Sequence, residues 1–485
     1  MTDSSDRSIA FARETMLPAR EPPVSQRGIV RWMRENLFSS PMNTILTLLG
    51  LGLIFLTIRA ALPWFINGVW NANSLAECRA IIAERAGPDA SGACWAMIRE
   101  RWHQFTFGFY PPDQYWRPIL AFGLLFAAIA PVLFAGQKRN LMVVIAGVAA
   151  FLLVTLYLAS TPLLAFVFAA ALVIVLAVLS QTQPGKLMWF TVLYPALTFY
   201  LLWGGSIWEP VTAMFGFVII AVTYRLLVER IGVAVSSAIG VVLAMLWWLF
   251  IDAHVADALA SALPLALPKV NSDQFGGFLL AVTIGVTAIA CSLPMGILLA
   301  LGRRSDMLLI KTLSVGFIEF IRGVPLITLL FTASLLLQYF LPPNTNFDLI
   351  LRVIILVTLF AAAYIAEVIR GGLAALPRGQ YEAADSLGLD YWRAQRLIIM
   401  PQALKIAIPG IVSTFIGLFK DTTLVAFVGL LDPLKGVTQI VRADINWKGI
   451  YWEPYIFVGV IFFVICFGMS RYSMSLERRL KRDHR

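Results

Sequence analysis

The sequence predicts an all-α integral membrane protein with about twelve transmembrane helices. The first reason is composition: 59% of the 485 residues are hydrophobic and only 14% are charged, against roughly 25% charged residues in soluble domains. The second reason is that the apolar residues form runs comparable with the ~20 residues that a helix needs to cross a bilayer. A soluble domain of this size would show amphipathic helices instead.

The chain is basic, with 38 Lys and Arg against 28 Asp and Glu. Nucleic-acid binding is one interpretation of such a balance. The basic residues, however, lie in short loops and at the chain ends and do not follow one face. This distribution favours a membrane protein, in which Lys and Arg gather in cytoplasmic loops.

The chain begins with a polar segment, residues 1–40, that carries several arginines before the first apolar run. A cleavable signal peptide would be shorter, so we expect a cytoplasmic N-terminal tail. The expected transmembrane helices follow in order at residues 44–66, 118–136, 140–158, 162–180, 187–204, 211–228, 232–251, 274–301, 310–340, 347–373, 403–430 and 453–473.

Placing the tail in the cytoplasm makes every second connection cytoplasmic. All of these connections carry Lys or Arg, which supports an even number of spans and two cytoplasmic termini. They are residues 137–139, 184–186, 225–230, 303–304, 374–402 and the end of the chain at 478–485.

A long polar connection near residues 67–117 would then be external. It contains Cys78 and Cys94, which form a possible disulfide if the loop faces an oxidising periplasm; their spacing leaves the pairing open. Residues 95–116 of this connection are rich in aromatic side chains, which commonly lie at the membrane interface.

The composition changes near residue 272. Residues 41–272 contain accessory transmembrane helices with few charges, whereas residues 273–475 place charges at or near membrane depth. Because a charge at the centre of a bilayer costs about 2.5 to 3.5 kcal/mol on insertion scales, we expect function in this second part. These charged residues are Glu319, Arg322, Glu367, Arg370, Lys420 and Asp421.

Local structure signals divide the connection 374–402 into two short helices. Pro377 suits a helix start, Gly388 suits the left-handed residue after a helix end, Asp390 suits a new N-cap, and Pro401 suits a stop. The first of these helices would present an apolar ridge to a partner, flanked by acidic side chains. The ridge consists of Tyr381, Ala384 and Leu387, and the flanking residues are Glu382 and Asp385.

The spacing of Glu382-Ala383-Ala384, Gly388 and Pro401 resembles the EAA motif of ABC importer permeases. Flanking matches are similar to the polar amino-acid branch, whose substrates are His, Glu, Gln, Arg and opines. They are residues 319–325 (EFIRGVP), 364–372 (YIAEVIRGG), 379–384 (GQYEAA) and 420–424 (KDTTL). Thr423 stands where the branch commonly has Ser, which keeps the hydroxyl. The extra helices and residues 276–280 (GGFLL) resemble the M-type permease of the general L-amino-acid transport system.

The resemblance implies a permease subunit of an ATP-driven importer that moves L-amino acids across the bacterial inner membrane. Residues 273–475 would be the five-helix core of a type I importer, followed by a basic cytoplasmic tail at 476–485. The implied partners are a second related permease, a cytoplasmic ABC ATPase dimer that uses ATP and Mg, and a periplasmic amino-acid-binding protein. The aromatic residues 95–116 would be a contact for that binding protein or part of the interfacial belt.

The resemblance also implies two sets of site residues. The ATPase-coupling loop would use Tyr381, Glu382, Ala383, Ala384, Asp385, Leu387, Gly388 and Pro401. Candidates for the translocation path are Glu319, Arg322, Glu367, Arg370, Lys420, Asp421, Thr422 and Thr423. Two other interpretations stay open: Glu367 and Arg370 can pair with each other on one helix, and Lys420 and Asp421 can reach the interface.

The sequence contains no phosphate-binding loop of the Gly-x-x-x-x-Gly-Lys-Ser/Thr type. Its three histidines, His103, His254 and His484, are scattered and form no metal-ligand spacing with the cysteines. We therefore expect neither an enzyme nor a metalloprotein. The alternative from another class is an ion-coupled secondary amino-acid transporter, for which about twelve helices with buried charges are ordinary features.

Overall fold

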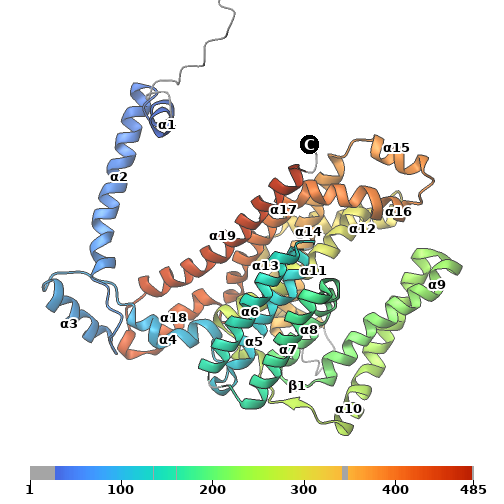
Figure 1. The fold of residues 1–485 in the computed structure, drawn as a ribbon, viewed down its shortest axis with the longest axis horizontal. Helices are drawn as coiled ribbons and strands as arrows, with labels where there is room; N and C mark the ends of the chain where they lie inside the picture. The colour runs from blue at the N-terminus through green and yellow to red at the C-terminus, as the bar shows by residue number, and fades with distance from the viewer. Residues whose placement is uncertain (1–27, 135, 160, 341–347, 483–485) are drawn as a thin grey trace, which may run out of the picture. The chain divides into compact units, whose positions relative to one another are not determined.

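The computed structural model describes residues 28–134, 136–159, 161–340 and 348–482. The chain divides into two compact units, Met1–Ala96 and Met97–Arg485, and each is treated separately below. The helices are labelled in Figure 1.

The first unit contains one long apolar helix and a small disulfide-linked segment. Its helices are α1 (Gly28–Asn36), α2 (Pro41–Ile66) and α3 (Leu75–Ala86). Ser40 caps α2 by accepting a hydrogen bond from the Asn43 amide over 3.2 Å. A disulfide joins Cys78 to Cys94, and the ring of the adjacent Trp95 lies 5.7 Å from those of Trp64 and Trp70.

The second unit is almost entirely helical. Its first half contains α4 (Ala96–Phe107, of which Ala96 belongs to the first unit), α5 (Trp116–Leu133), α6 (Lys138–Leu158), α7 (Leu163–Thr182), α8 (Leu187–Trp203), α9 (Trp208–Leu246) and α10 (Asp252–Ala262). Its second half contains α11 (Gly277–Arg303), α12 (Leu308–Gly323), α13 (Leu326–Phe340), α14 (Leu349–Ala374), α15 (Gly379–Ser386), α16 (Tyr391–Ala394), α17 (Met400–Asp421), α18 (Pro433–Ala443) and α19 (Trp452–Arg482).

Short elements complete this unit. Two strands, β1 (Gly205–Ser206) and β2 (Ala266–Leu267), pair antiparallel. One-turn and irregular helical segments are η2 (Pro112–Gln114), η3 (Pro184–Lys186), η4 (Trp247–Ile251), η5 (Ser272–Gln274), η6 (Gln395–Ile399), η7 (Thr422–Val428) and η8 (Ile445–Trp447).

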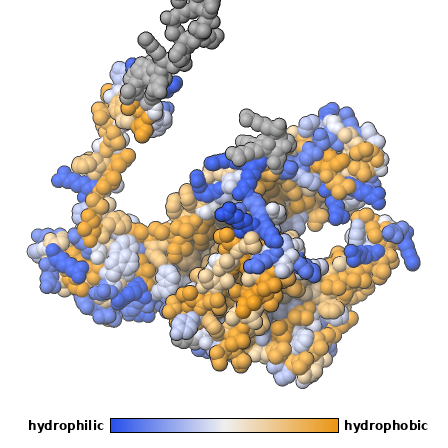
Figure 2. All heavy atoms as spheres, viewed as in Figure 1, coloured by the Kyte–Doolittle hydropathy of each residue, from blue (hydrophilic) through white to orange (hydrophobic). Residues whose placement is uncertain are grey.

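The helices support the predicted membrane spans. Among the described residues, 11 helices are long and apolar enough to cross a bilayer, or up to 12 if one bent pair counts as a span. They follow the predicted segments in order, and hydrophobic residues cover most of the visible surface in Figure 2. The connection expected at 225–230 is helical instead, because α9 continues to a kink at Gly232, where φ is 80°.

The span expected at 310–340 is bent and is not one continuous helix. α12 ends at Gly323 and α13 starts at Leu326, with 103° between them. Val324 is extended, with φ −106° and ψ 132°, because the ring of Pro325 disfavours helical geometry in the residue before it. Glu319 and Arg322 therefore lie near the end of α12 and not in the middle of a long helix.

The hydrophobic core of the second unit crosses the compositional boundary at 272. One cluster of buried side chains includes Leu124 of α5 and Leu152 of α6 together with Ile284 of α11 and Val353 of α14, all 0% exposed. The helices α5–α8 therefore pack in the same core as the helices that carry the candidate site.

The aromatic residues 95–116 lie only partly as expected. Trp102 and Phe109 are exposed, as an interfacial belt requires. Phe105, Tyr110 and Trp116 are buried in the second unit. Aromatic side chains bury large apolar areas, and here they join the segment before α5 to the rest of the unit.

Candidate functional site

The predicted coupling loop forms a short helix, α15, that ends at a glycine. The Gly388 amide donates to the Asp385 carbonyl over 2.9 Å, and the Leu389 amide donates to the Ala384 carbonyl over 3.2 Å. This pair of bonds is a Schellman motif, which requires a left-handed residue, and Gly388 has φ 68°. Asp390 precedes α16 in extended geometry, but its side chain makes no capping hydrogen bond and instead pairs with Arg393 at 3.4 Å.

The prediction that α15 presents an apolar ridge to a partner is wrong for two of its three residues, which face the interior of the chain. Ala384 is 1% exposed and Tyr381 packs beside it against the ends of α14 and α17, whereas Leu387 is 72% exposed. Tyr381 and Ala384 face inward because they shield from water the apolar side chains that cluster at these helix ends. The exposed face of α15 consists of Glu382, Ala383, Asp385, Ser386 and Leu387.

Pro401 does not end the second short helix, as the sequence predicted that it would. The π-helical turn η6 leads from α16 directly into α17, and Pro401 lies in the first turn of α17. A proline is tolerated there because the wide turn before it already interrupts the regular hydrogen-bond pattern.

Side-chain contacts connect α15 to two neighbouring segments. Arg304, in the connection between α11 and α12, donates to the Tyr381 hydroxyl over 2.9 Å, and its guanidinium lies 5.5 Å from the Tyr381 ring centroid. Gln402 of α17 donates to the Gln380 side chain over 2.8 Å. A displacement of α15 would therefore act on both α17 and the α11–α12 connection.

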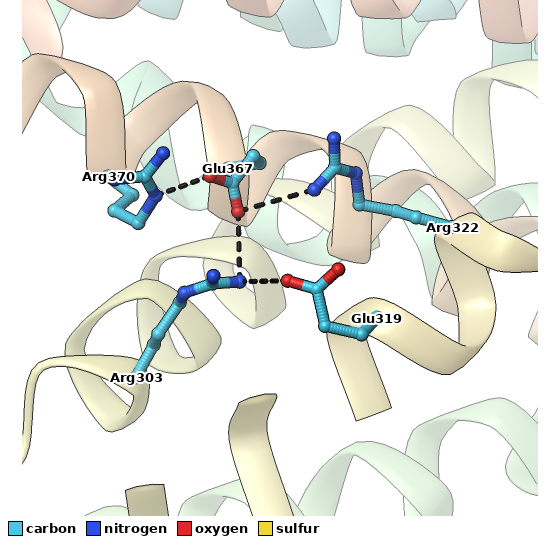
Figure 3. A network of polar contacts seen from close by, with 5 residues as sticks. All are labelled: Arg303, Glu319, Arg322, Glu367 and Arg370. Atoms are coloured by element: carbon cyan, nitrogen blue, oxygen red, sulfur yellow. Dashed lines mark hydrogen bonds and ion pairs between the residues drawn. The ribbon is translucent and has the colours of Figure 1, made fainter. Parts of the chain in front are cut away.

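An ion-pair network links α11, α12 and α14 (Figure 3). Arg303, at the end of α11, contacts Glu319 at 2.7 Å and Glu367 at 3.1 Å. Glu367 also pairs with Arg322 at 3.5 Å and with Arg370 on its own helix. The predicted Glu367–Arg370 pair is present, and the network brings Glu319 and Arg322 to it.

Glu367 is the centre of this network. Its side chain is 17% exposed, whereas that of Glu319 is 54% exposed. Three arginines contact the Glu367 carboxylate, so the five side chains together carry one net positive charge. A partly buried carboxylate shared by several guanidinium groups holds helices together and keeps the arginines oriented.

Arg303 and Arg304 are functional candidates that sequence reasoning missed. Both appeared only as basic residues of a cytoplasmic connection. Their partners lie 16 and 64 residues away for Arg303 and 77 residues away for Arg304. The available signal was their position beside the end of a span, where an arginine can reach back to a carboxylate at the next helix ends.

The remaining candidates lie at the far end of α17 from the coupling loop. The α-helix changes to the tighter η7 at Thr422, whose hydroxyl donates to the Phe419 carbonyl over 2.8 Å. Lys420 is exposed and Asp421 is partly exposed. The Thr423 hydroxyl donates to the Lys420 carbonyl over 2.9 Å. Within the described residues, these four candidates do not join the network of Glu367, so the translocation-path candidates fall into two separate places.

The described residues contain no group of three or more His, Cys, Asp or Glu side chains that could hold a metal ion. The side chains of the network around Glu367 pair with one another, and their chemistry is that of charge and hydrogen bonding.

Comparisons with known proteins give the family. Residues 292–482 match the model described as binding-protein-dependent transport system inner membrane component. The chain is 63% identical over 485 residues, covering 100% of both chains, to the glutamate/glutamine/aspartate/asparagine transport system permease protein BztC of Rhodobacter capsulatus. It is 36% identical, over 94% of each chain, to the inner membrane amino-acid ABC transporter permease protein YhdY of Escherichia coli.

A solved structure described as an amino acid ABC transporter with histidines is 31% identical, with a TM-score of 0.37, over 41% of this chain and 91% of that one. The full-length relatives confirm the predicted family, function and all-α membrane fold, and the ion-coupled alternative is not supported. The protein is a multi-pass inner membrane component that works with an ATPase and a binding protein. The chain belongs to the permease subunits of the amino-acid ABC importers, which are non-catalytic membrane components.

Proposed function

We propose that the chain imports glutamate, glutamine, aspartate and asparagine. The proposal follows the name of the relative that is 63% identical over the full length of both chains. These four amino acids share a short side chain that ends in a carboxylate or an amide, so one polar path can serve all of them.

The proposed role of α15 is to dock on a cytoplasmic ABC ATPase dimer that uses ATP and Mg. The observation that carries this role is a short helix, closed by the Gly388 motif, that leaves Glu382 and Leu387 exposed. Its contacts through Tyr381 and Gln380 would transmit a displacement to α17 and to the α11–α12 connection.

The two groups of charged candidates receive different proposed roles. Glu319, Arg322, Glu367 and Arg370 are engaged in ion pairs across three helices, which favours a role in joining helices over direct substrate contact. Lys420, Asp421, Thr422 and Thr423 lie where α17 tightens into η7. An amino acid is a zwitterion, so this turn, which offers both signs of charge, is the proposed substrate contact.

The proposed topology places both termini in the cytoplasm. The loop charges support it, and so does the Cys78–Cys94 disulfide, since such bonds persist in the periplasm and are rare in the cytosol. We propose the division of the chain that the sequence predicts: a cytoplasmic tail at 1–40, accessory transmembrane helices at 41–272, the importer core at 273–475 and a basic cytoplasmic tail at 476–485. The proposed further partners are a second, related permease and a periplasmic amino-acid-binding protein.

Uptake by the reconstituted complex tests the function. The chain, the second permease, the ATPase and the binding protein would be placed in proteoliposomes and assayed with radiolabelled L-glutamate, L-glutamine, L-arginine and L-leucine. We expect ATP-dependent uptake of the first two. Uptake of arginine or leucine at an equal rate would contradict the proposed substrate class.

Gly388→Trp tests the coupling role of α15. The space around Gly388 is open within this chain, so a bulky side chain there would obstruct a docked partner; the strain that a side chain meets at a positive φ is matched in the control. We expect loss of uptake at normal abundance. Gly87→Trp is the matched control, because Gly87 also has a positive φ, 102°, and open space around it. Normal uptake by the Gly388 variant would remove this residue from the coupling role.

A further inference from the structure

Helix α4 is attached to the segment that connects α18 and α19, more than 300 residues later in the chain. Arg101 forms an ion pair with Asp444, whose side chain is 10% exposed. The indole N–H of Trp447, a fully buried residue, donates to the Glu100 carboxylate over 2.8 Å. Two neighbouring residues of α4 therefore hold both ends of the short segment η8.

Apolar and backbone contacts continue this attachment along α4. The ring of Phe105, which is 1% exposed, lies 5.8 Å from the ring of Phe457 in α19. The Phe109 amide donates to the Gln274 carbonyl over 3.1 Å. Gly277, at the start of α11, allows the Phe105 carbonyl to approach so closely that any β-carbon there would collide with it.

The segment held by α4 is connected to the polar turn at the end of α17. Helix α18 runs from Asp432, which caps it through the amides of Leu434 and Lys435, to Asp444. The Lys435 ammonium group donates to the Ala426 carbonyl of η7 over 3.1 Å. Because η7 begins at Thr422, the position of α18 acts on the turn that contains Lys420 and Asp421.

We infer that Glu100 and Arg101 are positioning residues for transport. They fix η8 and α18 against the start of the permease core, and α18 in turn holds the turn at 420–423. The inference rests on the proposed substrate contact of that turn. It assigns a transport role to a helix that lies in the long connection before residue 117 and well before the segment 292–482 that matches the family model.

Charge exchange in the reconstituted complex tests the inference, with L-glutamate uptake as the readout. Arg101→Ala is expected to lower the maximal uptake rate per assembled complex about tenfold, as a lost contact in a coupled network would. The double variant Arg101→Asp with Asp444→Arg restores the pair in reverse and is expected to recover most of the rate. Arg442→Ala removes one exposed positive charge from the last turn of α18 and is the matched control.

The outcomes separate this inference from the proposed function. Wild-type uptake by Arg101→Ala, or a double variant no faster than the single one, overturns the positioning role. If Arg101→Ala does not accumulate, Glu100→Ala, which removes the acceptor of the Trp447 indole and leaves the buried ring in place, decides by the same rate measurement. Asp421→Asn tests the turn itself: normal uptake by that variant overturns the proposed substrate contact, whatever the Arg101 variants do.

Discussion

At the scale of single residues, the Glu367 carboxylate has the largest number of described ionic partners. Glu367→Gln would leave Arg303, Arg322 and Arg370 without its charge. We expect the free energy of unfolding to fall by about 2 kcal/mol, the value of a hydrogen bond to a charged group. Thermal unfolding of the purified complex in detergent measures this loss.

Glu319→Gln is the control for that experiment. Glu319 contacts Arg303 alone in the network and its side chain is 54% exposed. Exposed ion pairs contribute little to stability because water and salt screen them, so the melting temperature should change little. Equal shifts for the two variants would contradict a central role for Glu367.

Tyr110 gives a pH-dependent prediction. Its buried hydroxyl donates to the Leu202 carbonyl in the last turn of α8 over 2.8 Å, and burial raises its pKa from 10.0 to about 12. The unfolded chain therefore ionises first, so the contribution of Tyr110 to stability is present below pH 10 and is lost as the pH rises towards 12. Tyr110→Phe should be about 1 kcal/mol less stable at neutral pH and should lose less stability between pH 10 and 12.

Melting curves of the wild type, Tyr110→Phe and Tyr157→Phe at several pH values check this prediction. Tyr157 is 76% exposed, so its loss controls for the removal of a hydroxyl. An identical alkaline response of wild type and Tyr110→Phe would show that another group controls the stability there.

Residues close in sequence were the ones that could be predicted to interact. The Glu367–Arg370 pair follows from a spacing of three on one helix. The contact between Arg303 and Glu367 joins residues 64 apart, and no helical periodicity predicts which helices become neighbours. The same reason explains why Arg304 was not connected to Tyr381.

At the scale of helices, ends marked by local chemistry were predictable and irregular geometry was not. The glycine after α15 acts within a few residues and lies where the sequence predicted, whereas Asp390 precedes α16 without a capping hydrogen bond from its side chain. The break before Pro325 does have a local signal, because a proline disfavours helical geometry in the residue before it. The sequence predicts a helix end at Pro401, but the helix continues through the π-helical turn η6. Such a turn depends on hydrogen-bond geometry that the sequence does not reveal.

The two faces of α15 should respond differently to substitution. Leu387→Ser changes an exposed side chain and should leave the stability of the isolated chain unchanged. Burying a leucine contributes about 1.5 to 3 kcal/mol, so the same variant should weaken binding of the ATPase about tenfold or more. Ala384→Leu adds volume to a buried position and should lower the melting temperature. Titration of the ATPase onto the purified permease, with melting curves, checks both.

At the scale of the whole molecule, the shared core makes α5–α8 necessary for folding. Residues 273–485 alone would expose Ile284, Val353 and their neighbours, which pack against these helices. We expect that fragment to aggregate in detergent, whereas a chain starting at Met97 keeps the core of the second unit and should remain monodisperse. Size-exclusion chromatography distinguishes the two, and a monodisperse 273–485 fragment would contradict the need for α5–α8.

The order of the spans was predictable because each span is a long run of apolar residues that can be recognised in the sequence. The packing of α4 was not. Its aromatic residues predicted an interfacial belt, and composition alone cannot tell a ring that faces lipid from one buried between helices. The change at residue 272 marks where charges enter the spans, and the hydrophobic core continues across it.

Thiol accessibility checks the proposed topology of the first unit. Asp89→Cys places an exposed thiol in the connection between α3 and Cys94 and leaves the disulfide in place. On intact spheroplasts, a membrane-impermeant maleimide should label this variant strongly and the wild type weakly. Labelling of the variant only after lysis would place the segment in the cytoplasm. It would contradict the proposal that both termini are cytoplasmic.

The disulfide also has a consequence for handling the protein. It closes a separation of 16 residues between α3 and the segment before α4, and a loop of about 15 residues contributes about 3 kcal/mol in the chain-entropy account. Reducing agents, which are routine in the purification of cytosolic ATPases, would remove that contribution from the permease. Buffers for the assembled transporter should therefore omit them, and expression hosts should supply an oxidising compartment.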